Sequence, residues 1–131
     1  MRNLVLSLCL ILTLPVAAQA LDAAGFEAEV TGQTLEYTSG GHPYGTEQYL
    51  PNRGVIWQAE GGDCRRGRWY EEGPKRICFV YDDAGTPQCW GFSKEGKSLT
   101  ARFEGQMGGS LLRETRRSKA PLTCRDPYHG V

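Results

Sequence analysis

The chain has 131 residues, and its 15 lysines and arginines balance 15 aspartates and glutamates, so the formal net charge is zero. A chain of this length builds one domain with a modest core. Its neutral balance gives no support for long-range attraction to nucleic acid or to an anionic membrane surface. The composition therefore argues against nucleic-acid-binding and membrane-surface proteins.

The first twenty residues, MRNLVLSLCLILTLPVAAQA, predict a cleavable export signal over residues 1–20. Arg2 precedes an apolar run from Leu4 to Leu14, and Ala18-Gln19-Ala20 has the small-x-small pattern that a signal peptidase cleaves. The run is shorter than the roughly 20 apolar residues that span a bilayer. We therefore expect a periplasmic or secreted protein without a transmembrane segment, whose mature chain begins near Leu21.

Loss of the export signal removes Cys9 and leaves Cys64, Cys78, Cys89 and Cys124. An even number of cysteines in a small exported chain predicts two disulfides. A zinc site is the alternative, but it usually needs closely spaced cysteine pairs, and this sequence has none. All three connectivities remain open. Strand alternation around a turn at Gly73-Pro74 favours Cys64–Cys89 together with Cys78–Cys124.

The predicted elements begin with a short helix over Ala23–Val30, which Asp22 caps and Gly32 ends. After the helix, alternating apolar residues and Gly/Pro-rich turns predict a series of short strands. We expect strands over residues 34–38, 46–50, 55–59, 68–70, 77–81, 89–92, 99–103 and 111–115.

Regular short strands of this kind predict a mainly all-β fold. We expect an antiparallel up-and-down meander, small barrel-like or lipocalin-like, with the short N-terminal helix. The run ICFVY at residues 77–81 is apolar on both faces, as expected of a central strand that is covered on both sides. A single disulfide-stapled β domain is expected over residues 21–124, followed by a flexible tail over 125–131.

The segment GFSKEGKS, Gly91 to Ser98, matches the phosphate-binding P-loop pattern G-x-x-x-x-G-K-[ST]. A working P-loop needs a helix after it, because the helix N-terminus holds the phosphates. The following residues, Leu99 to Phe103, alternate with the period of a strand. We therefore interpret the match as the polar turn of a hairpin and not as a nucleotide site.

Candidate catalytic and metal-binding residues are scarce. His42 and His129 do not belong to a His-x-x-x-His or H-E-x-x-H pair, so the sequence predicts no metal site. With the cysteines in disulfides, only elimination would name Ser39 or Ser110 as a nucleophile. The sequence thus predicts no catalytic residue and no cofactor, and it favours a non-catalytic protein. A small envelope hydrolase remains the alternative.

Aromatic residues fall on the predicted strands, where most of them are expected to build the core. Some of them are expected to line a barrel mouth or groove, because small barrels often hold one ligand. Alternation along a strand would place Arg66 and Arg68 on one outward face, which is either a solvated face or a surface for an acidic envelope partner. The candidate binding surface comprises Tyr44, Tyr49, Trp57, Arg66, Arg68 and Trp69.

Three runs carry a resemblance to known proteins: CRRGRW at 64–69, ICFVY at 77–81 and TPQCW at 86–90. Together with TLEY and EQYLPN, they resemble a group of uncharacterised small exported bacterial proteins with lipocalin-like or related β-meander folds. The resemblance covers most of residues 32–124. It implies export, a β fold and paired cysteines, but no catalytic or ligand-binding residues. We expect a binding or interaction module of the cell envelope, whose partner is a small apolar molecule, an envelope component or another protein.

Overall fold

The computed structural model describes residues 9–15, 17–105 and 110–125. Most of this part of the chain is β-strand, with one α-helix and one turn of 3-10 helix. The helical elements are α1 (Ala23–Val30) and η1 (Pro51–Arg53). The strands are β1 (Gln19–Ala20), β2 (Thr34–Ser39), β3 (His42–Tyr49), β4 (Gly54–Ala59), β5 (Cys64–Glu71), β6 (Ile77–Tyr81), β7 (Ala84–Glu95), β8 (Ser98–Phe103) and β9 (Leu111–Ser118).

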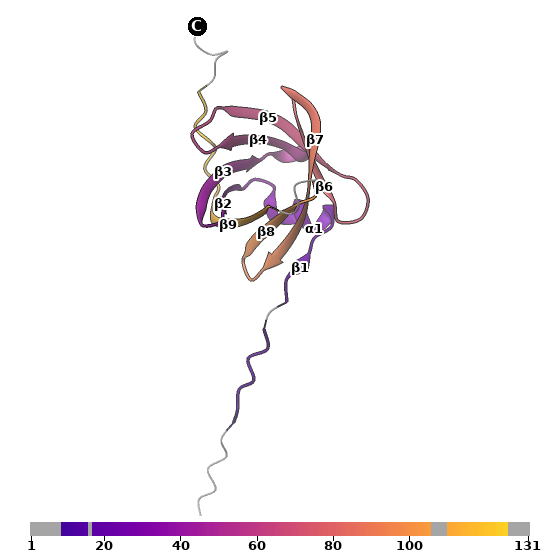
Figure 1. Ribbon diagram of the computed structural model, residues 1–131, viewed down its shortest axis with the longest axis vertical. Helices are drawn as coiled ribbons and strands as arrows, with labels where there is room; N and C mark the ends of the chain where they lie inside the picture. Colours follow the sequence, from indigo (N-terminus) through magenta and orange to yellow (C-terminus); the bar gives the residue numbers. More distant parts are fainter. Residues whose placement is uncertain (1–8, 16, 106–109, 126–131) are drawn as a thin grey trace, which may run out of the picture.

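The strands form a closed antiparallel barrel (Figure 1). From β2 to β9, each strand pairs with the next one along the chain, and β9 also pairs with β2. Closure removes the exposed edges that an open sheet would present. The short strand β1 is additional and pairs with β7. The fold confirms the predicted all-β, up-and-down meander with a short N-terminal helix.

Several strands are longer than the sequence predicts. Strand β3 begins at His42, inside a segment expected to be a turn, and β7 likewise begins at Ala84. Antiparallel pairing across the hairpins extends both strands despite their turn-forming composition. Pro43 is tolerated in β3 because the pairing with β4 starts only at Gly45, so no ladder hydrogen bond to β4 is lost.

The disulfides join Cys64 to Cys124 and Cys78 to Cys89. Two disulfides were predicted, but the favoured connectivity was wrong. The register of β6 and β7 places Cys78 directly opposite Cys89, so these two cysteines are cross-strand neighbours. Cys64 starts β5 near the other end of the barrel, and the segment after β9 brings Cys124 to it.

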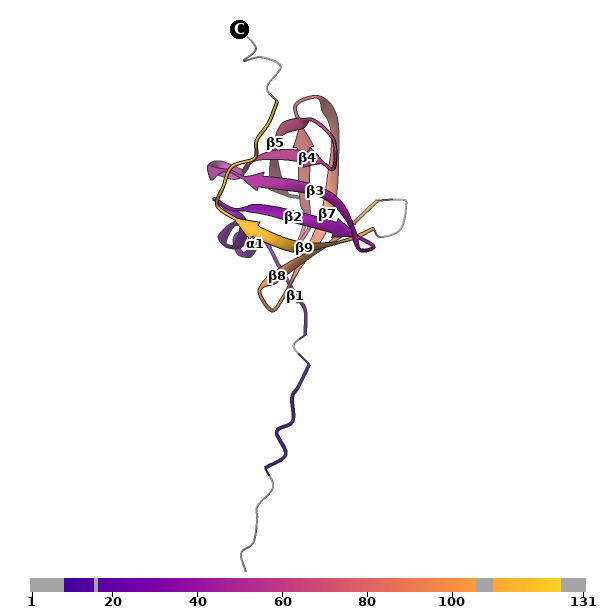
Figure 2. The same ribbon diagram turned by 90° about the vertical axis from the view of Figure 1, so that its left-hand side faces the viewer.

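Helix α1 covers one end of the barrel (Figure 2). The Asp22 side chain accepts a hydrogen bond from the Gly25 N–H at 2.8 Å, which confirms the predicted N-cap. Phe26 is fully buried and reaches the barrel interior. Its ring centroid lies 4.4 to 5.6 Å from those of Tyr49, Trp69 and Phe92.

Polar contacts fix the helix to the barrel wall. The Ala23 N–H donates to a Glu71 carboxylate oxygen at 2.7 Å, which ties the helix start to the end of β5. At the helix end, Glu29 contacts both Lys94 and Arg117, and these contacts lower the pKa of its carboxyl group. Arg117 also binds the buried carboxylate of Glu114 on β9. The helix is therefore a fixed part of the barrel.

The P-loop-like segment lies on β7, a tight turn and β8. Glu95 pairs with Ser98, so Gly96 and Lys97 form the turn between them. Gly96 has a φ of +61°, a conformation that glycine adopts without strain. The predicted hairpin is confirmed, and a strand follows the motif where a P-loop would have a helix.

The two ends of the described chain differ in their packing. The segment after β9 runs along the outside of the barrel toward β5 (Figure 2). The Leu122 N–H donates to the Gln48 side chain at 3.0 Å, and Thr34 donates to the Ala120 carbonyl at 2.7 Å. The N-terminal segment from Leu10 to Leu14 instead extends away from the barrel (Figure 1), and its leucine and isoleucine side chains are exposed. Among the described residues, no helix is long and apolar enough to span a membrane. Most of the expected tail, residues 126–131, and His129 with it, lies outside the described residues.

Candidate ligand-binding cavity

The barrel interior contains a cavity of about 310 Å³. Each of the eight barrel strands contributes at least one side chain to its wall, because inward residues alternate with outward ones along every strand. The lining residues are Tyr37, Tyr44, Glu47, Tyr49, Trp57, Ala59, Arg65, Phe79, Tyr81, Gln88, Trp90, Phe92, Ala101 and Leu112. The wall is thus largely aromatic, with a small polar cluster.

Helix α1 closes the cavity at one end. The lining residues Tyr49, Phe79 and Phe92 all pack against Phe26 of the helix. Tyr44 lies toward the opposite end, where the β2–β3, β4–β5 and β6–β7 turns meet, and is 39% exposed. This arrangement gives the cavity a closed floor and a mouth at the end with these turns.

Glu47 is the central polar residue of the wall. It is 4% exposed, and both of its carboxyl oxygens lie within hydrogen-bonding distance of the Tyr81 hydroxyl, at 3.1 and 3.2 Å. Burial raises the pKa of the Glu47 carboxyl well above its ordinary value, although the Tyr81 hydrogen bond and the Arg65 charge oppose this rise. The neutral acid therefore persists to a higher pH than it would in water.

Arg65 lies in the wall beside this cluster. Its guanidinium binds Asp83 with Nε–carboxylate distances of 2.9 and 3.0 Å, and it stacks over the Tyr81 ring with Cζ 4.7 Å from the ring centroid. The hydrogen bond from Arg65 lowers the pKa of the Asp83 carboxyl. Asp83 therefore balances the Arg65 charge, and the pair adds little net charge to the cavity.

A second polar group is formed by two tyrosines. The hydroxyl oxygens of Tyr37 and Tyr49 lie 2.9 Å apart, and both residues are buried. Burial raises the pKa of both phenols, so both stay protonated. Only one of the two hydroxyl hydrogens is used between them, which leaves the other available to a ligand.

Two glycines make room for aromatic rings in the wall. A Cβ atom on Gly45 would lie 2.3 Å from the Trp57 ring, and one on Gly67 would lie 2.3 Å from the Val80 carbonyl oxygen and 2.8 Å from the Tyr81 ring. Real Cβ atoms do not approach other atoms so closely. The absence of a side chain at Gly67 therefore allows Tyr81 to occupy its position beside Glu47.

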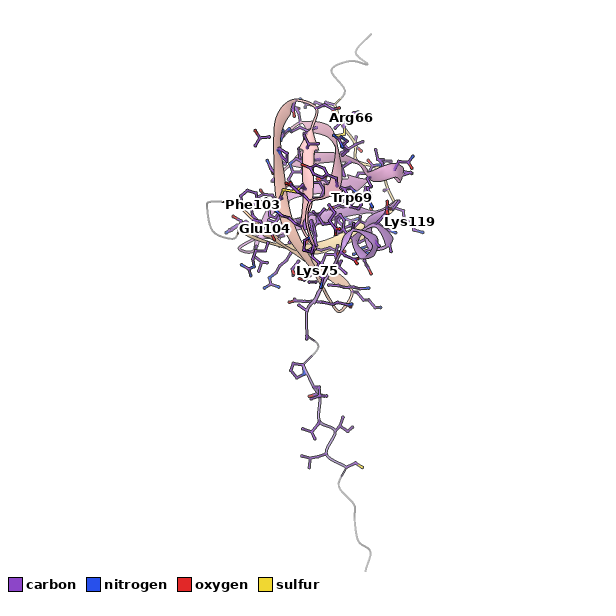
Figure 3. All side chains as sticks on the ribbon, turned by 90° about the vertical axis from the view of Figure 1, so that its right-hand side faces the viewer. Arg66, Trp69, Lys75, Phe103, Glu104 and Lys119 are labelled. Atoms are coloured by element: carbon purple, nitrogen blue, oxygen red, sulfur yellow. A yellow bond between two sulfur atoms is a disulfide. The ribbon has the colours of Figure 1, made fainter. Side chains whose placement is uncertain are left out.

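The structure divides the candidate binding surface predicted from the sequence. Tyr44, Tyr49 and Trp57 lie together in the cavity wall. Arg66 and Arg68 are exposed on the outer face of β5. Trp69 is buried beneath α1, away from the cavity wall, and the Arg53 guanidinium covers its ring at 4.5 Å. Figure 3 shows Arg66 near the top of the barrel and Trp69 near its middle.

Three features of the cavity wall were not predicted from the sequence: Glu47, Arg65 and the inward position of Tyr81. Period-two alternation would have indicated the first of these, because Glu47 shares a strand face with Tyr49. The same reasoning applies to Arg65, because placing Arg66 and Arg68 outward places their neighbours inward. A charged residue on a strand face that is otherwise expected to point inward was the sequence signal by which Glu47 and Arg65 could have been found.

A catalytic Ser–His pair and a metal site have less support in the structure. Ser39 and His42 are register partners at the β2–β3 turn, but no hydrogen bond joins their side chains in the described structure. Glu72, Cys78 and Cys89 lie close together, yet both sulfurs belong to a disulfide and cannot act as thiolate ligands.

Comparisons of the chain with protein-family models, with curated proteins and with solved structures found no match.

Proposed function

We propose that this protein is an exported, non-catalytic binding protein of the cell envelope, which holds a small, mainly apolar molecule inside its barrel. The observation that carries the proposal is the cavity of about 310 Å³, closed at one end by α1 and lined by aromatic and a few polar side chains. Ligand sites are typically concave and apolar, with a few polar groups that fix orientation.

The cavity size limits the ligand. Small-molecule sites usually measure about 300–1,000 Å³, so this cavity is at the lower limit. An apolar cavity of about 150 Å³ suffices to bind benzene. A molecule with one aromatic ring and a short substituent therefore fits, whereas a long-chain lipid would have to protrude through the mouth.

Export is proposed on two observations. The described apolar residues of the N-terminal run, Leu10, Ile11, Leu12 and Leu14, are exposed and lie outside the barrel core, as expected of a segment that serves export and is then removed. Two disulfides also favour an oxidising compartment. Cleavage after Ala20 would remove β1, which is outside the closed ring of eight strands.

Binding is tested by titrating the purified, oxidised protein with a panel of small aromatic and aliphatic compounds. Trp57 and Trp90 line the cavity, so their fluorescence should change when a compound enters. A bound compound should also raise the melting temperature, because it stabilises only the folded state.

Ala101→Phe supplies the matched variant, because Ala101 is 1% exposed and lines the cavity. A phenyl group there should fill the cavity and weaken binding by about tenfold or more, which corresponds to at least about 1.4 kcal/mol. Ala24→Phe adds the same group on the exposed face of α1 and should leave binding unchanged. Equal binding by all three proteins would refute the cavity as the site.

Export is tested separately by expressing the full chain in a bacterial host and measuring the intact mass of the product. A mature form that starts at Leu21 is expected in the periplasm or the medium. An uncleaved product in the cytoplasm would contradict export and leave the binding proposal unaffected.

A further inference from the structure

The buried carboxyl group of Glu47 in the cavity wall indicates which chemical class of ligand the cavity binds. Glu47 is 4% exposed, and among the described residues the Tyr81 hydroxyl is the one group that donates a hydrogen bond to its carboxyl oxygens. A carboxylate can accept about four hydrogen bonds. Most of this accepting capacity is unused by the protein and available to a molecule in the cavity.

Aromatic rings surround this carboxyl group. Eight of the fourteen lining residues are tyrosine, tryptophan or phenylalanine. The faces of such rings attract cations, with tryptophan the strongest. The one basic side chain among the lining residues is Arg65, whose charge is balanced by Asp83. The wall therefore presents a carboxyl group and ring faces, and has no uncompensated positive charge to hold an anion.

We propose that the cavity selects small molecules that carry an ammonium group on an apolar, ring-sized body, and that Glu47 and the surrounding aromatic faces bind the ammonium group. This ligand class rests on the proposed function, because it specifies what the same cavity binds. The ammonium hydrogens donate to the Glu47 oxygens, and the Tyr81 hydroxyl holds the carboxyl group in place. The apolar body occupies the aromatic part of the cavity above Phe79 and Phe92.

A neutral ligand accounts for the wall less well. Burial of an ionisable carboxyl group costs free energy, and an amide or hydroxyl side chain would orient a neutral molecule at a lower cost. An anionic ligand fits poorly, because it would lie beside Glu47 and an arginine that is already paired. Among the described residues, Arg65 is near Glu47 but directs its hydrogen bonds to Asp83, so a ligand that brings a positive charge gives the buried carboxyl group a hydrogen-bonded ionic partner that the protein does not supply.

The proposed ligand class predicts how binding depends on pH. The ionisable groups that face Glu47 are Tyr37 on β2, Tyr49 on its own strand, Arg65 on β5 and Tyr81 on β6. Burial raises the pKa of Glu47, so the carboxyl group of the free protein must release a proton when an ammonium group binds. The apparent affinity for an amine should therefore rise with pH until Glu47 is ionised in the free protein. The affinity for a neutral analogue should stay constant.

The test compares three probes of similar size by isothermal titration calorimetry: phenethylamine, phenethyl alcohol and hydrocinnamate. We expect the amine to bind about tenfold or more tightly than the alcohol, and the carboxylate to bind most weakly. In buffers with different ionisation enthalpies, the measured heat should reveal proton release with the amine only. These measurements use the unaltered protein and do not depend on any variant folding.

Glu47→Gln keeps the size of the side chain and removes its charge. We expect this variant to lose about tenfold or more in affinity for phenethylamine, so that its preference for the amine over phenethyl alcohol is lost. Glu60→Gln removes an exposed carboxylate from the β4–β5 turn and should change neither affinity. Thermal melting of each variant verifies that it is folded.

The outcomes separate the two proposals. If phenethyl alcohol binds as tightly as phenethylamine, or if Glu47→Gln binds the amine unchanged, the ammonium ligand class is overturned and the proposed binding function stands. If none of the three probes binds, and the broader panel also gives no response, both proposals are overturned.

Discussion

Gly67 faces the barrel interior between Arg65 and Trp69, directly opposite Tyr81 on the paired strand β6. Gly67→Ala would place a methyl group 2.3 Å from the Val80 carbonyl oxygen. Because this oxygen belongs to the backbone of the paired strand, the strand itself must move. We expect a loss of about 1–3 kcal/mol in the free energy of unfolding, measured by urea denaturation.

Gly85→Ala is the control for this substitution. Gly85 lies on β7 and has no positive φ, and a methyl group added there would meet no atom of the described residues within 4 Å apart from its chain neighbours. Its replacement should change the free energy of unfolding by no more than about 0.5 kcal/mol. Equal effects at Gly67 and Gly85 would show that the close approach of Tyr81 does not constrain the wall.

Glu47 should also make stability depend on pH. Its pKa is raised in the folded state, and the unfolded chain has an ordinary glutamate pKa of about 4.3. Between these two values the folded state holds a proton that the unfolded state has lost. The free energy of unfolding should therefore fall as pH rises through this window, by up to about 1.4 kcal/mol per pH unit.

Comparison of the unaltered protein with Glu47→Gln isolates this effect, since the variant has no proton to lose. Urea denaturation from about pH 5 to about pH 8 should show the flatter profile for the variant. Glu29 and Asp83 act in the opposite sense, because their lowered pKa values contribute stability that is lost on acidification. Their window lies below that of Glu47. Parallel profiles for the two proteins would contradict the raised pKa.

Alternation along a strand was enough to predict which side chains share a face. It places Glu47 on the same face as Tyr49, but the residue type argued against an inward position, because an isolated glutamate in a short strand is normally solvated. Trp69 illustrates the reverse difficulty. Its strand position suggested a binding surface, but the residue lies beneath α1, and only the folded chain places the helix there.

Helix α1 is the element that gives the cavity a floor. Phe26 is fully buried among aromatic rings of β3, β5, β6 and β7. Phe26→Ala should therefore lower the free energy of unfolding by about 3–5 kcal/mol. Asp22→Ala, which removes only the N-cap hydrogen bond, should cost about 1 kcal/mol. Thermal and urea unfolding of both variants should show this order, and a smaller effect at Phe26 would mean that the helix is not integral to the barrel.

Elements were predicted well where their signals are local. The Asp22 cap defined the start of α1, and the apolar run ICFVY defined β6 at its observed bounds. The ends of β3, β5 and β7 were less accurate, because cross-strand pairing extends these strands through residues with turn-forming composition. Pairing partners lie outside the local sequence window, so their effect on strand ends was not visible.

The whole molecule is held by two disulfides with different spans. The cysteines of the Cys64–Cys124 disulfide are 60 residues apart in the sequence, whereas those of Cys78–Cys89 are 11 residues apart. In the chain-entropy description, the longer loop contributes about 4 kcal/mol and the shorter about 3 kcal/mol. Replacing both cysteines of each pair by alanine should therefore destabilise the protein more at Cys64–Cys124. Thermal melting checks the order, and peptide mapping without reduction should recover the same two pairs; any other pairing would contradict the register of β6 and β7.

The closure of the barrel could not be predicted from the sequence. A meander of neighbouring hairpins follows from the short strands and turns, but the pairing of β2 with β9 joins segments far apart in the chain. No local pattern specifies that pairing. The cavity depends on it, because its wall draws on residues from every barrel strand.

The most direct test of the cavity as a binding site uses the three tryptophans. Trp57 and Trp90 line the cavity, whereas Trp69 lies beneath α1. The indole N–H signals of isotope-labelled protein can be followed by NMR during a titration with phenethylamine. We predict saturable shifts of the Trp57 and Trp90 signals, with the Trp69 signal moving least. Unchanged signals, or a response led by Trp69, would contradict binding inside the barrel.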